Sequence, residues 1–176
     1  MCMRRVYSHR KIEEHPREKR GFSCALKLLR SEIVYDVDYI SWKVAQCRIS
    51  EEGSRAEAQT DQENSDWLTR QVETALDNAK DRISAYVVEM SRMQTDEDEN
   101  RDEWDIVLYM EPGWRGSSKT MNTYIHRYVV DFVLTEWFKM TMPEETAIYV
   151  ASAEGWLDRF INEARDVVVK DVIFRL

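Results

Sequence analysis

Cysteine, proline and glycine are scarce in this sequence, which has three, three and five of them among 176 residues. The cysteines Cys2, Cys24 and Cys47 are odd in number and show no CxxC or CxxH spacing. This pattern argues against a disulfide framework and against a zinc site. We therefore expect reduced thiols and no bound metal ion.

Long apolar runs are missing as well. No stretch approaches the roughly 18 consecutive apolar residues of a membrane-spanning helix, and the N-terminus has no apolar signal-peptide core. We expect a soluble protein that is made in the cytoplasm and has no membrane partner. The length suits one domain that buries its core without disulfides, and the charged fraction of 33% suits the exposed faces of helices.

Catalytic motifs are also absent, including GxSxG, HExxH, a Gly-rich phosphate loop and a dinucleotide fingerprint. The segment GWRGSSKT (113–120) lacks the GxxxxGK[ST] spacing, and its serines are better explained as helix caps. A lone helical histidine such as His126 is usually a surface residue. We predict a protein that is not an enzyme and has no catalytic residue or cofactor. An enzyme would need a pocket in which His126 meets buried carboxylates.

The N-terminal segment 1–21, called the basic arm below, differs in charge from the rest of the chain. It has seven basic residues against Glu13, Glu14 and Glu18, a net charge of +4. Since the whole chain carries −8, the remainder carries −12. Such an arm can contact nucleic acid, dock on an acidic neighbouring subunit, or remain a solvated tail. Its basic residues, our predicted interface residues, are Arg4, Arg5, Arg10, Lys11, Arg17, Lys19 and Arg20.

A second charged block, Asp96–Asp105, is acidic and opposed only by Arg101. It lacks the central glycine and the terminal bidentate glutamate of a calcium-binding loop. We therefore interpret it as a solvated connector.

The first half of the chain alternates between the periods of strands and helices. Residues 22–28 alternate apolar and polar side chains, which predicts a half-buried strand. Ser31 is a candidate N-cap of a helix that reaches about Arg48. The polar stretch 49–64 is interpreted as a loop. The apolar stripe from Trp67 to Met90 predicts a second helix.

The second half begins with a predicted strand, 104–110, which Pro112 and Gly113 end. Ser117 or Ser118 can cap a third helix, whose apolar positions continue to Met140.

Pro143 suits the first turn of a fourth helix, in which Gly155 is a weak position unless close packing requires it. Only Thr141 and Met142 separate the third and fourth helices, so they must be antiparallel neighbours. We predict an α+β fold, mostly α, with a four-helix antiparallel bundle and a small two- or three-stranded sheet. The predicted units are the basic arm, a domain at 22–166, and a C-terminal strand or extended tail at 167–176.

Six tryptophans are many for this length. Most fall on apolar stripes, which favours roles in the core or in subunit contacts. Trp114 lies instead in the turn after Gly113, and we predict that it is exposed and anchors an interface.

The segments SEIVYDVDYISWKVAQCRI, WDIVLYMEP and TYIHRYVVDFVLTEWFKMTMPEETAIYVASAE together carry a resemblance. They resemble small proteins encoded in the virion-structure modules of tailed phages and prophages of Bacteroidales, including the crAss-like phages. The likeness covers residues 22–165. It is most specific at Tyr128–Tyr149, where a Tyr-hydrophobic-x-x-x-hydrophobic-x-x-Trp-Phe/Tyr pattern precedes a helix break. The chain departs from that family in its longer basic arm and in lacking a basic, proline-bearing C-terminal tail.

The resemblance implies a virion structural protein of the portal, neck or tail region, with no catalytic residues to transfer. A head-to-tail connector or adaptor that forms a ring is the leading expectation, located in the virion and assembled in the host bacterial cytoplasm. Its partners would be copies of itself and portal, neck or tail proteins, with genomic DNA passing through the lumen without specific binding. The alternative is a small regulatory protein that binds nucleic acid through the basic arm.

Overall fold

A computed structural model describes residues 21–52, 65–93 and 102–167 of the chain. The charged residues of the basic arm, most of the predicted loop 49–64 and most of the C-terminal tail lie outside these residues. The fold is α+β and mostly helical, as predicted. In chain order its elements are β1 (Phe22–Leu29), α1 (Arg30–Glu52), α2 (Ser65–Ile83), β2 (Val87–Met93), β3 (Glu103–Met110), α3 (Ser118–Thr141) and α4 (Pro143–Ala164).

The three strands form one antiparallel sheet in the order β1-β3-β2. Phe22 pairs with Met110 at one end, and Leu29 pairs with Glu103 at the other. Alternate residues of β1 and β3 are buried under the helices, and the opposite face of these strands is more open. The most deeply buried strand residues are Leu26, Leu28, Ile106, Leu108 and Met110.

The strand β2 corrects our prediction that the second helix continues to Met90. Its apolar residues fit a helical stripe by spacing, but α2 ends at Ile83 and a turn leads into Val87. Pairing with β3 satisfies the backbone of both strands, and this tertiary pairing overrides a weak local preference. A bulge at Val88 leaves that side chain 63% exposed.

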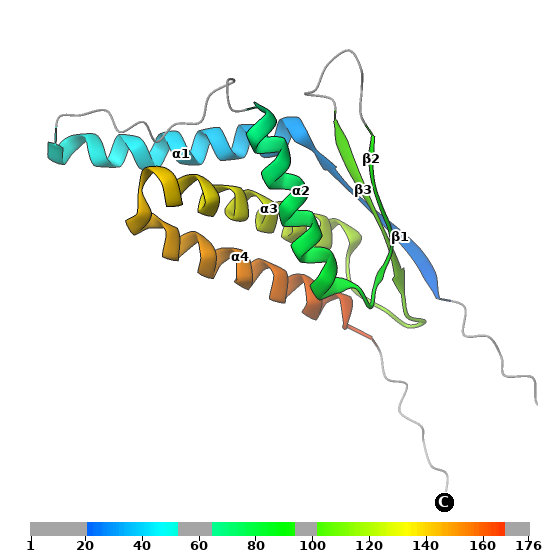
Figure 1. Cartoon of the computed structure of the whole chain (residues 1–176). Helices are drawn as coiled ribbons and strands as arrows, with labels where there is room; N and C mark the ends of the chain where they lie inside the picture. The colour runs from blue at the N-terminus through cyan, green and yellow to red at the C-terminus, as the bar shows by residue number, and fades with distance from the viewer. Residues whose placement is uncertain (1–20, 53–64, 94–101, 168–176) are drawn as a thin grey trace, which may run out of the picture.

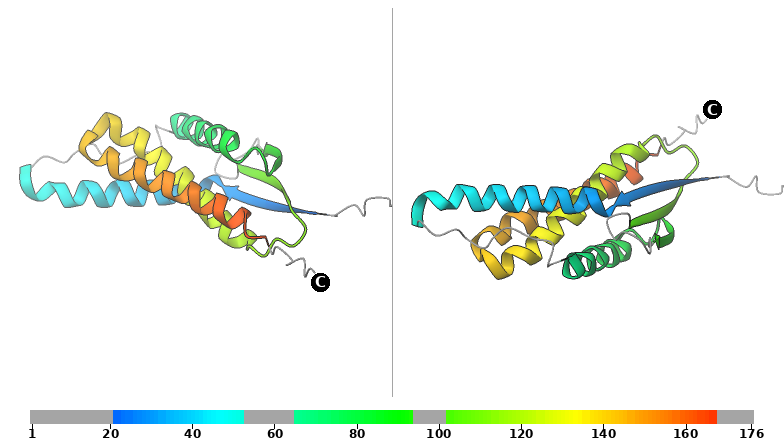
Figure 2. Two further views of the ribbon diagram at one scale, coloured as in Figure 1. Left: turned by 90° about the horizontal axis from the view of Figure 1, so that it is seen from below. Right: turned by 90° about the horizontal axis from the view of Figure 1, so that it is seen from above.

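The helices α3 and α4 form the predicted antiparallel hairpin, with Met142 alone between them. The helix α1 continues directly from β1 and packs along α3. The helix α2 crosses α3 instead of running along it (Figures 1 and 2). The predicted four-helix antiparallel bundle is therefore not confirmed, although the four helices and the small sheet are present.

Two of the three helix starts that we predicted from the sequence are confirmed. Ser117 is the N-cap of α3 and accepts a hydrogen bond from the Thr120 backbone nitrogen at 3.3 Å. Pro143 occupies the first turn of α4. Ser31 is not a cap, because α1 already begins at Arg30, immediately after β1.

Gly155 is a position at which the fold can be made more stable. Among the described residues, no heavy atom outside the local backbone of α4 lies within 4 Å of the place where its Cβ would be, so close packing does not require glycine there. Replacing Gly155 by alanine is expected to raise the free energy of unfolding by about 1 kcal/mol, measured by urea denaturation. Gly116→Ala is the control and should destabilise, because its Cβ would meet the Trp114 ring at 2.5 Å.

Candidate functional site

The outer face of α1 exposes three large aromatic side chains in a row. Tyr35, Tyr39 and Trp42 are 68%, 44% and 43% exposed, and their i, i+4, i+7 spacing places them on one face of the helix. We call these three residues the aromatic stripe. The rings of Tyr35 and Tyr39 lie parallel, with centroids 6.2 Å apart. The ammonium group of Lys43 lies 4.6 Å from the centre of the Tyr39 ring.

The opposite face of α1 is buried, and the buried side chains become smaller toward the end of the helix. Ile33 and Val37 are fully buried near the sheet, and the next buried positions are the small residues Ser41 and Ala45. Cys47, two residues beyond Ala45, is exposed. The i, i+4, i+7 spacing of the aromatic stripe is present in the sequence. It was not recognised as a surface feature, because the apolar residues of the buried face have a similar helical spacing.

A hollow of about 310 Å³ adjoins the aromatic stripe between α1 and α3. His126 of α3 lies in it with its Nε2 atom 3.1 Å from Asp36 Oδ2, and Arg127 approaches the same oxygen at 3.8 Å. The His126 side chain is only 14% exposed, so our expectation of an unpartnered surface histidine is wrong. We call this the α1–α3 hollow; it is lined by Ser31, Glu32, Tyr35, Asp36 and His126.

The pair of His126 and Asp36 orients an imidazole, as a catalytic base requires, but no nucleophile from the part of the chain that the structure describes is hydrogen-bonded to it. Ser31 lines the same hollow, yet within the described ranges it donates no hydrogen bond to the imidazole. The contact between His126 and Asp36 therefore links α3 to α1 by polar side chains.

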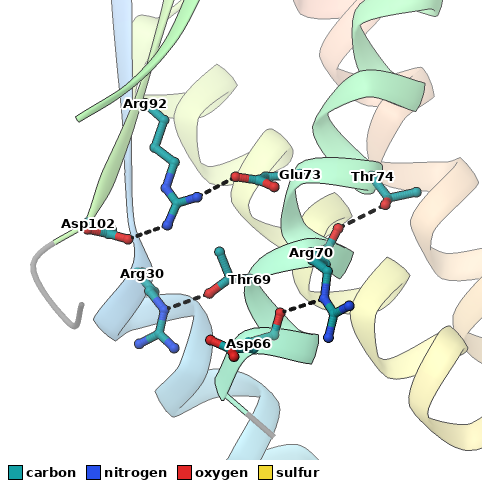
Figure 3. Close-up of polar contacts among 8 residues, drawn as sticks. All are labelled: Arg30, Asp66, Thr69, Arg70, Glu73, Thr74, Arg92 and Asp102. Carbon is teal, nitrogen blue, oxygen red and sulfur yellow. Dashed lines mark hydrogen bonds and ion pairs between the residues drawn. The ribbon is translucent and has the colours of Figure 1, made fainter. Parts of the chain in front are cut away.

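A second polar cluster joins α2 to the sheet (Figure 3). Arg92 of β2 donates to Glu73 of α2 at 2.5 Å and to Asp102 at 2.6 Å. The Asp102 side chain is 3% exposed, so contacts within the protein, this one among them, stabilise its charge instead of water. We expected Asp102 to belong to a solvated connector, and this part of that prediction is wrong. Just beside it, the buried Arg30 donates from Nε to Thr69 at 3.1 Å.

Another hollow of about 260 Å³ lies beside Arg92, between α2 and the sheet. The guanidinium carbon of Arg92 lies 5.8 Å from the centre of the Trp104 ring. The buried indole nitrogen of Trp104 has no hydrogen-bond partner within the part of the chain that the structure describes. The residues that line this hollow include Glu73, Leu76, Asp77, Met90, Arg92 and Trp104.

A buried carboxylate holds the α3–α4 hairpin together. Asp131 Oδ2 accepts hydrogen bonds from the Ser152 hydroxyl at 2.5 Å and from the Trp156 indole nitrogen at 3.0 Å. Burial raises the pKa of Asp131, and these two hydrogen bonds and the charge of Arg127 act in the opposite direction. Nearby, burial raises the pKa of Tyr128 to about 12. Both groups serve the packing of the hairpin.

Trp114 is half-buried, which corrects our prediction that it is exposed in the turn. Its indole nitrogen donates to the backbone oxygen of Glu163 at 2.7 Å, and its ring centroid lies 5.6 Å from that of Phe22. Its backbone also pairs with Val167, the first residue of the predicted tail. Trp114 therefore closes the end of α4 against β1, and its role as an interface anchor stays a prediction.

The basic residues of the arm lie outside the described ranges, so the structure brings none of them to these surfaces. Within the described ranges there is no group of three or more acidic, histidine or cysteine side chains placed to hold a metal ion. Across the same ranges, no helix is both long and apolar enough to span a membrane.

Comparisons of the chain with protein-family models, curated proteins and solved structures give no match.

Proposed function

We propose that this protein is a structural subunit of a tailed-phage virion, a head-to-tail connector or adaptor that forms a ring between the portal and the tail. It acts by shape and carries out no reaction. Copies of itself, portal proteins and neck or tail proteins are its partners, and the virion is its location.

The observation that carries this proposal is the aromatic stripe on α1. Tyrosine and tryptophan are enriched at protein–protein contacts, where they bury large areas with few rotatable bonds. Tyr35, Tyr39 and Trp42 form a continuous exposed row on one helix, which a monomer has no need to maintain. A ring needs such a surface, because each copy must bury one patch against a different patch of the next.

The charge of the chain fits a ring that surrounds DNA. Residues after the basic arm carry a net charge of −12, by subtraction of +4 from the total of −8. Negative charge along a lumen disfavours the phosphate contacts that hold DNA to a protein. DNA can therefore pass through the ring without binding it.

The double variant Tyr39→Ser/Trp42→Ser tests the subunit contact. The wild-type chain is expected to sediment as a closed ring of many copies, and the variant as a monomer, because it loses most of the aromatic stripe. Ile148→Ser/Val150→Ser on α4 is the matched control, since these side chains are similarly exposed at 63% and 43%. Rings that survive in the stripe variant, or a wild-type chain that stays monomeric at high concentration, would contradict the proposal.

The rival function, nucleic-acid binding through the basic arm, is favoured by the charge of that arm alone. It predicts binding of the full chain to DNA that weakens with salt and disappears when residues 1–20 are deleted. The connector proposal predicts no such binding in the same titration.

A further inference from the structure

We propose that the α1–α3 hollow receives an arginine or lysine side chain from the basic arm of a second copy of this chain. This inference rests on the proposed function, because it names the contact by which one copy holds the next.

The hollow has the chemistry that recognises a cation. Glu32 and Asp36 supply carboxylates, and Tyr35, 68% exposed, offers the face of an aromatic ring. Asp36 is partly neutralised by Arg127, and its Oδ2 atom also contacts His126. Glu32 forms no ion pair with any residue in the described ranges, so its charge remains available.

The aromatic stripe already binds one cation of its own chain. Lys43 holds its ammonium group 4.6 Å from the centre of the Tyr39 ring, and Tyr39 lies parallel to Tyr35. The ring of Tyr35 is the next aromatic face along the same row. A second cation at Tyr35 would repeat this contact and add the charge of Glu32.

Size limits what the hollow accepts. Its volume of about 310 Å³ is at the lower end of the range for small-molecule sites. One or two side chains fit this space, and they can enter it because the hollow is open to solvent. A basic segment that places one side chain in the hollow and lays its neighbours along the aromatic stripe satisfies both features.

The basic arm is the occupant that charge and position favour. Its net charge of +4 complements the acidic remainder of the chain. The arm joins the described body at Gly21, at the end of β1 far from α1 (Figure 1). The eight residues of β1 separate this point from the hollow by about 26 Å. In a head-to-tail ring, the arm therefore starts on the side of the body away from its own hollow.

The direct test is a titration with a synthetic peptide of residues 1–20. Its target is the full chain in which the seven basic arm residues are replaced by glutamine, so that no arm of its own competes. We expect the peptide to bind, to weaken with added salt, and to lose roughly tenfold or more in affinity when the target also carries Glu32→Lys/Tyr35→Ala. The control Glu89→Lys/Met93→Ala makes the same charge change among exposed residues of β2 and should leave affinity unchanged. Equal binding to the hollow variant and the control overturns the inference.

A second measurement tests whether the occupant comes from another copy. Labelled full chains carrying Glu32→Lys/Tyr35→Ala, with either the natural or the neutralised arm, are titrated onto the immobilised arm-neutralised chain. Tighter binding of the chain with the natural arm, by roughly tenfold, supports docking between copies. Equal binding overturns it.

These results separate the inference from the proposed function. If the peptide binds through the hollow but the wild-type chain forms no rings, the ring proposal is wrong and the docking site stands. If rings form through the aromatic stripe but the peptide does not bind, the docking site is wrong and the ring proposal stands.

Discussion

Replacing Arg92 by alanine is expected to lower the free energy of unfolding by about 3 to 5 kcal/mol. The change takes the Arg92 guanidinium away from the carboxylate of Asp102, which is 3% exposed. It also removes the contact that joins Glu73 of α2 to β2, and the cation from the Trp104 ring. Removing one member of a buried ion pair costs far more than the intact pair contributes. Urea denaturation followed by far-UV circular dichroism measures the effect.

Arg82→Ala is the matched control. Arg82 also contacts two carboxylates, Glu154 and Asp158, but these side chains are 58% and 64% exposed. Solvent screens such pairs, so we expect a loss of less than about 1 kcal/mol. If the two variants were equally stable, burial of Asp102 would not control the strength of the cluster. The Arg92→Lys variant should have a free energy of unfolding well below that of the wild type, because one ammonium group does not reproduce the two-pronged contact of a guanidinium with two carboxylates.

The second large effect is expected from Trp114→Ala, with a loss of about 2 to 3 kcal/mol. The substitution removes a half-buried indole, its hydrogen bond to Glu163 and its packing on Phe22. Trp114→Phe should retain part of the packing and lose the hydrogen bond, which gives an intermediate stability. Thermal unfolding monitored by circular dichroism distinguishes the three proteins.

Trp42→Ala provides the contrast with Trp114→Ala. Trp42 is 43% exposed on the aromatic stripe, so its loss should change the free energy of unfolding by less than about 1 kcal/mol. If the proposed ring forms, the same substitution should shift it toward monomers. A Trp114 variant of normal stability with impaired assembly would reverse this assignment and restore the interface role that its position in the turn first indicated.

Local signals predicted those elements whose boundaries are set by neighbouring residues. The aromatic and β-branched residues of Trp104–Met110 predicted β3, and the cap at Ser117 and the proline at 143 predicted the starts of α3 and α4. The strand β2 was missed, because the spacing of Val87 and Met90 fits both a helix and a strand until the partner strand is known. The crossing of α2 over α3 likewise depends on packing that no local pattern records.

The candidate sites depend on pairs that are far apart in the sequence. Asp36 meets His126 across 90 residues, so no spacing rule connects them. The burial of Trp114 depends on Phe22 and Glu163, which come from opposite ends of the domain. The aromatic stripe differs, because its spacing is local and only its exposure required the structure.

The direct junction of Leu29 to Arg30 joins β1 to α1 without a linker, and the chain bends where the two elements meet (Figure 1). Eight strand residues and 23 helical residues give this joined unit a contour length of about 60 Å. The root of the arm lies at one end of the unit and the aromatic stripe lies along its helical part, so the distance between them does not vary as it would across a flexible linker. In the ring that we propose, every copy would carry the same spacing between these two points, and the circumference would follow from the number of copies.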